Sequence, residues 1–257
     1  MNGLRLAISF LTVLPVALHN MPYDLASARA YFPLVGLMLG GALAGIDLAL
    51  QALFPSLLNG AVLVVMLIVL TGALHIEGFM DACDSLLGGY TQERRLEILH
   101  DPHIGAFAVV GGVSLLLLKW TAVVSLPVSI RAPLLVLFPC LSRWGMLIDM
   151  EVYPYARLQG MGIAFQQSRN RWQVAVGFAT TFIASLLLAG AAGVLLLAVA
   201  TALALGLGRW MAGLLGGLTG DTYGTVNETT EVVVLLVGIA VEAMAPSMFL
   251  SPLSWGG

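Results

Sequence analysis

Charged residues are scarce in this 257-residue chain, making up 10% of it against roughly 25% in an average soluble domain. Hydrophobic residues make up 59%, and the mean hydropathy is +0.96. So little charge could not keep a folded surface in water, which excludes a soluble oxidoreductase and a disordered scaffold. A net charge of −3 offers no basic field, so we expect no nucleic-acid partner. The two cysteines, Cys83 and Cys140, provide no disulfide framework.

What the sequence does have is long apolar runs between polar breaks. Runs long enough to cross a lipid bilayer cover residues 4–18, 33–53, 60–76, 104–126, 133–150, 173–189, 193–212 and 231–249. They predict an all-α, polytopic membrane helix bundle with seven or eight transmembrane segments. No soluble domain is visible, so residues 1–257 are expected to form a single integral membrane domain. The first run is expected either to span or to be re-entrant.

The arginines are distributed unevenly between the two faces of the predicted bundle. If every run spans, the long polar breaks share one face, which carries Arg29, Arg94, Arg95, Arg157, Arg169 and Arg171. The other face keeps only Arg5 and Arg131. By the positive-inside rule, the polar loops are expected to face the cytoplasm.

Three carboxylates lie at the end of one apolar run. On a helix, Glu77, Asp81 and Asp84 occupy positions i, i+4 and i+7 and share one face. They can be ionised together only if a cation neutralises them, and hard oxygen ligands suit Mg²⁺, Mn²⁺ or Ca²⁺. The alternative is a helix end whose acids merely face water, although such a face would normally include lysine and this one has none.

A short amphipathic helix is predicted next, ending at Asp101-Pro102. Its Arg94 and Arg95 could clamp phosphate oxygens. They could equally form a surface pair with Glu97 and add to the positive-inside charge. Asp101 could bind the same metal ion as the three carboxylates. The neighbouring His100 and His103 are weaker candidates for the site.

A second polar, glycine-rich cluster covers residues 216–231, before the last run. Its glycines allow backbone N–H groups to approach an anion closely. Asp221, Asn227 and Glu228 add oxygen ligands, and Thr219 and Gly220 stand directly before them. The alternative is a plain connecting loop.

Several ionisable groups fall inside the apolar runs. Because a charge inside a membrane is energetically costly, each such residue is a candidate functional residue. They are Asp47, Lys119, Arg143, Asp149 and Glu242. Lys119 and Glu242 could also serve as structural partners.

The motifs together resemble the cobalamin synthase family, the adenosylcobinamide-GDP ribazoletransferases, over nearly the full length. The segments that carry this resemblance are Phe10–Pro15, Tyr31–Gly36, His75–Gly89, Arg95–Gly105 and Gly217–Gly224. Two departures are visible. Glu77 stands where members often carry Asp, which keeps an oxygen ligand, and Ser85 stands where Gly is usual.

The resemblance implies the substrates and the metal. Adenosylcobinamide-GDP would donate its cobinamide-phosphoryl group to α-ribazole or its 5′-phosphate, releasing GMP, with Mg²⁺ as the expected metal. The site residues fall into three predicted groups. Metal ligands are Glu77, Asp81, Asp84 and Asp101; substrate contacts are His75, Arg94, Arg95, Thr219, Gly220, Asn227 and Glu228; catalytic groups are Asp101 and Asp221, of which Asp221 would orient or deprotonate the ribazole hydroxyl.

Two other classes are weighed against this enzyme. A CDP-alcohol phosphotransferase of lipid synthesis needs an Ala-Arg pair after its second Asp, and Leu86-Leu87-Gly88-Gly89 follows Asp84 here. A cation-coupled transporter would place acids near the midplane of several helices, whereas these cluster at helix ends. Besides the lipid bilayer and the substrates, a homo-oligomer or other cobalamin-assembly enzymes are conceivable partners.

Overall fold

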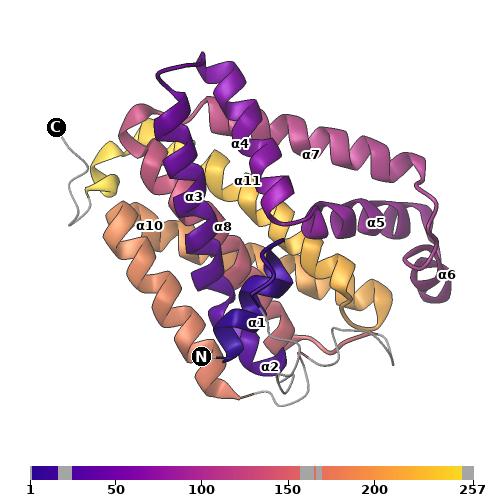
Figure 1. The fold of residues 1–257 in the computed structure, drawn as a ribbon. Helices are drawn as coiled ribbons and strands as arrows, with labels where there is room; N and C mark the ends of the chain where they lie inside the picture. The colour runs from indigo at the N-terminus through magenta and orange to yellow at the C-terminus, as the bar shows by residue number, and fades with distance from the viewer. Residues whose placement is uncertain (1, 17–24, 157–164, 166–169, 251–257) are drawn as a thin grey trace.

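The computed structural model describes residues 2–16, 25–156, 165 and 170–250, and these fold almost entirely as α-helices (Figure 1). Within them there is no strand, only an isolated bridge between Tyr155 and Leu218. The elements are α1 (Asn2–Leu11), α2 (Leu25–Ala28), η1 (Arg29–Tyr31), α3 (Phe32–Leu50), α4 (Ser56–Leu70), α5 (Leu74–Gly88), α6 (Gln92–Ile98), α7 (Ala106–Val124), α8 (Val128–Val152), α10 (Arg171–Leu215), α11 (Gly220–Met244) and η2 (Pro246–Phe249). The predicted all-helical class is confirmed.

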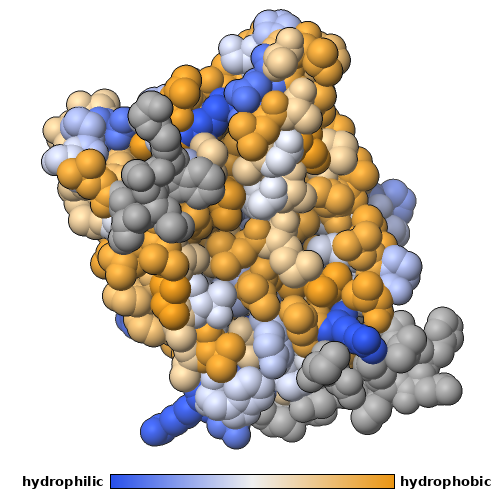
Figure 2. Space-filling model, turned by 60° about the vertical axis from the view of Figure 1, so that its left-hand side comes forward, coloured by the Kyte–Doolittle hydropathy of each residue, from blue (hydrophilic) through white to orange (hydrophobic). Residues whose placement is uncertain are grey.

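Five helical stretches of the described chain are long and apolar enough to cross a membrane, or six if one bent pair is counted. They are residues Ala26–Leu50 and the helices α7, α8, α10 and α11, with α4 and α5 as the bent pair. Apolar residues cover much of the outer face in Figure 2, and Val65, Leu117 and Ile183 each expose more than half of their surface. Lipid accounts for such a surface, so this is a multi-pass membrane protein. The predicted count of seven or eight spans is not confirmed.

The first predicted segment, 4–18, does not form a span. Its helix, α1, has 10 residues, and at about 1.5 Å per residue it reaches about half of the hydrocarbon thickness. Instead, α1 packs its buried Leu6 and Leu11 into the bundle.

The 45-residue α10 is divided at Gly190, where φ is 58° and ψ is −135°. Glycine alone adopts this combination readily, because a Cβ atom would clash with the backbone. A straight helix of that length would measure about 68 Å, more than twice the hydrocarbon thickness. The two arms, 171–189 and 191–215, match the two segments predicted over 173–189 and 193–212.

The bend between α4 and α5 measures 90° and turns the acidic helix away from the path of α4. Gly72 and Ala73 at the bend both have positive φ, 60° and 59°, which breaks the helix after Leu70. The segment predicted over 60–76 therefore ends earlier than expected. Beyond the bend, α5 packs against α7 and α11.

The core is built around α8, which packs on α3, α10 and α11. Of its most apolar stretch, 89% is buried. At the end where α8 begins, Arg131 donates to both Asp47 oxygens at 2.8 Å, and Asn59 also donates to Asp47. The functional site lies at the opposite end, where α8 ends.

Candidate functional site

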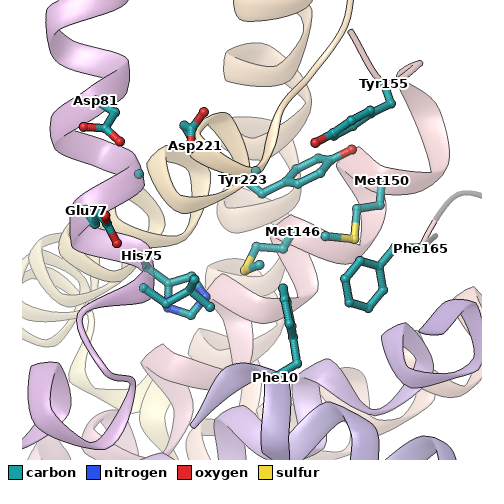
Figure 3. Close-up of a pocket in the computed structure, with 13 residues that line it drawn as sticks. Phe10, His75, Glu77, Asp81, Met146, Met150, Tyr155, Phe165, Asp221 and Tyr223 are labelled. Atoms are coloured by element: carbon teal, nitrogen blue, oxygen red, sulfur yellow. The ribbon is translucent and has the colours of Figure 1, made fainter. Parts of the chain in front are cut away.

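A cavity of about 280 Å³ lies where α8 ends and α11 begins (Figure 3). Two of its sides differ in chemistry. The acidic wall consists of Glu77, Asp81 and Asp221, and the apolar wall consists of Phe10, Met146, Met150, Tyr155, Phe165 and Tyr223. Leu74, His75, Gly78 and Gly220 complete the lining. Five predicted site residues, His75, Glu77, Asp81, Gly220 and Asp221, thus surround one cavity, although they lie about 140 residues apart in the chain.

The acidic wall exists because two helices cross in close contact. A Cβ atom on Gly78 would lie 2.9 Å from the Cα of Asp221, and one on Gly224 would lie 2.7 Å from the carbonyl oxygen of His75. Each distance is below the normal van der Waals separation, so only glycine fits at either position. The crossing brings carboxylates of α5 and α11 to the same cavity.

Asp221 is held at the first turn of α11 by a capping box. The Thr219 hydroxyl accepts from the N–H of Thr222, and the Thr222 hydroxyl accepts from the N–H of Thr219. Thr219 also donates to Asp221 Oδ2 at 3.2 Å. The helix N-terminus favours the negative charge of Asp221. Thr219 therefore orients the Asp221 carboxylate through this hydrogen bond. It does not itself line the cavity.

Asp84, which is predicted to bind metal, caps a helix in this structure. Its carboxylate accepts from the N–H groups of Gly105 at 2.6 Å and Ala108 at 2.9 Å, which caps the N-terminus of α7. Both oxygens are therefore engaged away from the cavity. The seven-residue spacing puts Asp84 on the same face of α5 as Glu77. The start of α7 packs over the part of that face that carries Asp84.

The residues predicted on and after α6 also lie outside the cavity wall. Arg94 pairs with Glu97 at 2.9 Å on the exposed surface, and Arg95 packs against Gly89. The N–H of His103 donates to Asp101, which lowers the pKa of the Asp101 carboxyl below its usual value. A direct role for these residues stays a prediction.

A buried ionic network lies next to the cavity. Lys119 of α7, the only lysine in the chain, donates to Glu228 at 2.5 Å and to Glu231 at 2.6 Å. Arg143 of α8 pairs with Glu231, and Asn227 donates to Glu231 at 3.3 Å. All five side chains are buried. Asn227 and Glu228 were predicted to contact substrate, but burial and ion pairing place them in this network, away from the lining.

His75 connects the network to the cavity. Its Nδ1 lies 3.5 Å from the Arg143 guanidinium, and the residue lines the cavity. Its Nε2 is buried, and within the described chain it has no hydrogen-bond partner. A buried ring nitrogen of this kind is suited to a bound ligand.

The structure does not contain the preformed four-carboxylate metal centre expected from the sequence. Among the described residues, no three His, Cys, Asp or Glu side chains lie close enough to hold one ion. Asp84 is bonded to the start of α7, and Asp101 is bonded to His103. Two acids of the acidic wall, Glu77 and Asp81, nevertheless suit Mg²⁺, which commonly takes one or two protein carboxylates and completes its shell with water and phosphate oxygens.

Sequence reasoning missed most of the apolar wall. Met146 and Met150 lie at the end of an apolar run and read as ordinary core residues. Phe10 and Tyr223 fall inside motifs that were singled out, but nothing marked their side chains. The spacing of Gly78 and Gly224 in the chain also gave no sign that they meet.

Fold and site together define the class: a multi-pass helical membrane protein with a carboxylate-lined ligand cavity at one end of its bundle. The family model described as cobalamin-5-phosphate synthase matches residues 3–239. The chain belongs to that family.

Curated relatives are similar in sequence to this chain over nearly its whole length. The adenosylcobinamide-GDP ribazoletransferase of Desulfitobacterium hafniense is 40% identical, covering 92% of this chain and 96% of the relative. The enzyme of that name from Stutzerimonas stutzeri is also 40% identical, covering 94% and 99%. The one from Synechococcus is 35% identical over 90% and 93%. No solved structure matches the chain.

Proposed function

We propose that this protein transfers the adenosylcobinamide-phosphoryl group of adenosylcobinamide-GDP to a hydroxyl of α-ribazole or of its 5′-phosphate. In this reaction the hydroxyl oxygen bonds to phosphorus, the P–O–P bond breaks and GMP leaves. Family membership and the names of the curated relatives support this transfer. The observation that carries the site assignment is the meeting of Glu77, Asp81 and Asp221 at one cavity.

A diphosphate can enter such a cavity only if its charge is neutralised. No Lys or Arg is among the described residues that line it. Glu77 and Asp81, the two acids that α5 contributes to the acidic wall, would therefore hold Mg²⁺, and phosphate oxygens and water could complete its shell. When bound, Mg²⁺ would neutralise the phosphoryl oxygens and the leaving GMP.

Asp221 is the best-placed group for the attacking hydroxyl. The Thr219 hydrogen bond and the N-terminal turn of α11 fix its carboxylate. It can accept the proton of the ribose hydroxyl and orient its oxygen towards phosphorus. A carboxylate beside a cation is a weak base, so positioning contributes more than basicity.

The finer topology is also a proposal. We propose that each arm of α10 crosses the bilayer and that, with the α4–α5 pair counted once, the chain crosses seven times. The cavity then faces the cytoplasm of a bacterial inner membrane, as the arginine distribution favours. Arg157 and Arg169, used in that count, lie outside the described residues.

The test is GMP release by the purified protein in lipid, with both substrates present. We expect release with Mg²⁺, loss of release with a chelator, and recovery when Mg²⁺ is restored. Glu77→Gln should abolish most activity while keeping the fold. Glu242→Gln is the matched control, because Glu242 bonds to Ser129 at the far end of the bundle. Absence of GMP with every divalent metal would refute the proposed function.

A further inference from the structure

The apolar wall is formed by residues brought together from distant parts of the chain. Met146 and Met150 come from the last turns of α8, Tyr223 from the first turn of α11, and Phe10 from the end of α1. The rings of Phe10 and Phe165 pack at a tilt, with centroids 4.6 Å apart. Figure 3 shows these side chains gathered on one side of the cavity and the acidic wall on the other. The proposed phosphoryl transfer leaves this wall without a role.

The size of the cavity limits what can enter it. At about 280 Å³ it lies near the lower end of the range for small-molecule sites. A corrin macrocycle with its side chains is several times larger. Of the substrates' parts, the diphosphate, the acceptor nucleoside and the guanosine of the donor are small enough.

The chemistry of the wall distinguishes the two nucleosides. The base of α-ribazole is a fused aromatic ring with two methyl groups and no N–H or C=O group. Guanine carries donors and acceptors along its edge, and these would lose water without finding partners on an apolar surface. The wall offers phenyl rings, thioethers and the two phenols of Tyr155 and Tyr223, but no amide or carboxylate. It suits the apolar base.

We propose that the apolar wall binds the aromatic base of the acceptor nucleoside and thereby turns its ribose towards Asp221. This inference rests on the proposed function. Aromatic faces stack on Phe10, and the methionine thioethers fill the irregular space around the methyl groups. The corrin ring stays outside the cavity, and only the diphosphate of the donor reaches the acidic wall.

The first experiment measures binding of α-ribazole alone, by calorimetry, to the full chain in lipid nanodiscs. Phe10→Leu keeps an apolar side chain but removes the aromatic face, and we expect about tenfold weaker binding. Phe10→Tyr should restore binding. Phe54→Leu is the matched control, because Phe54 lies beyond α3 at the opposite end, 40% exposed. GMP binding should be unchanged in every variant.

The second experiment uses the unaltered protein, so it does not depend on the folding of a variant. The α-anomer of adenosine has the same α-linked ribose but a polar-edged base, and we expect it to bind at least about tenfold more weakly than α-ribazole. Equal binding of the two nucleosides would overturn the proposal. So would a Phe10→Leu protein that loses affinity for GMP, or one that keeps full affinity for α-ribazole.

These outcomes are separable from failure of the proposed function. If the protein binds α-ribazole through Phe10 but releases no GMP from adenosylcobinamide-GDP, the proposed nucleoside site is supported and the proposed transfer is refuted. Protein that releases GMP with an unchanged KM for α-ribazole in Phe10→Leu would keep the transfer and refute the nucleoside site.

Discussion

Replacing Gly224 by alanine tests whether the helix crossing creates the acidic wall. The added Cβ would lie 2.7 Å from the carbonyl oxygen of His75 on α5, where ordinary contact begins at 3.4 Å. The two helices would have to separate by the difference, about 0.7 Å. The obstacle is backbone, so no side-chain rotation can relieve it.

Two consequences follow from a separation of that size. Overpacking of a close contact typically costs about 1–3 kcal/mol of unfolding free energy. The separation also moves Asp221 away from Glu77 and Asp81, and a misplacement of about 1 Å can lower the rate by about 10²-fold. We therefore expect kcat for GMP release to fall by about 10- to 100-fold in Gly224→Ala.

The assay combines GMP release in proteoliposomes with thermal unfolding followed by tryptophan fluorescence. Gly41→Ala is the control, since nothing lies within 4 Å of a Cβ atom built there on α3. Helix propensity favours alanine over glycine by about 1 kcal/mol, so this control should be neutral or slightly stabilised. Wild-type kcat and stability in Gly224→Ala would refute the claim that the crossing sets the geometry of the site.

Three further outcomes are expected. Lys119→Met should cost about 3–5 kcal/mol in thermal or denaturant unfolding, because its two carboxylate partners are left buried without that cation; an unchanged midpoint would contradict this. Asp84→Ala should cost about 0.5–2 kcal/mol through loss of the α7 cap, and Asp84→Asn should recover part of it. Because His103 lowers the pKa of Asp101, any stabilisation by this pair is present above the usual Asp pKa and lost as pH falls through the lowered value. Replacing His103 by alanine keeps the backbone N–H that donates to Asp101 and removes only the imidazole, so the pKa should rise part of the way towards its usual value in a side-chain NMR titration; an unchanged titration would show that the imidazole contributes nothing to the shift.

Membrane character and most helix positions could be predicted from the sequence, because lipid requires long, continuous apolar runs with internally satisfied backbones. The runs at 104–126 and 133–150 correspond to α7 and α8. Predictions failed at the breaks. The helix predicted over 60–76 stops at Leu70, and the one predicted at 4–18 is only α1, because these boundaries depend on backbone turns and on packing.

The candidate site, too, could be predicted only in part from the sequence. Glu77, Asp81 and Asp221 could be found in the sequence, because acids and glycines beside apolar runs are unusual whatever the fold. Asp84 fits the same pattern, yet it caps α7. Periodicity gives the face of a helix, but it does not say which neighbour covers that face.

The amino-acid sequence by itself determined that this is a helical membrane protein with acidic groups at helix ends, since solvent and charge act on each segment locally. Only the tertiary structure decided which acids share a cavity, that the single lysine is enclosed by two glutamates, and that aromatic and methionine side chains stand opposite the carboxylates. Those relations join segments far apart in the chain, and they arise from how closely two helix backbones can approach.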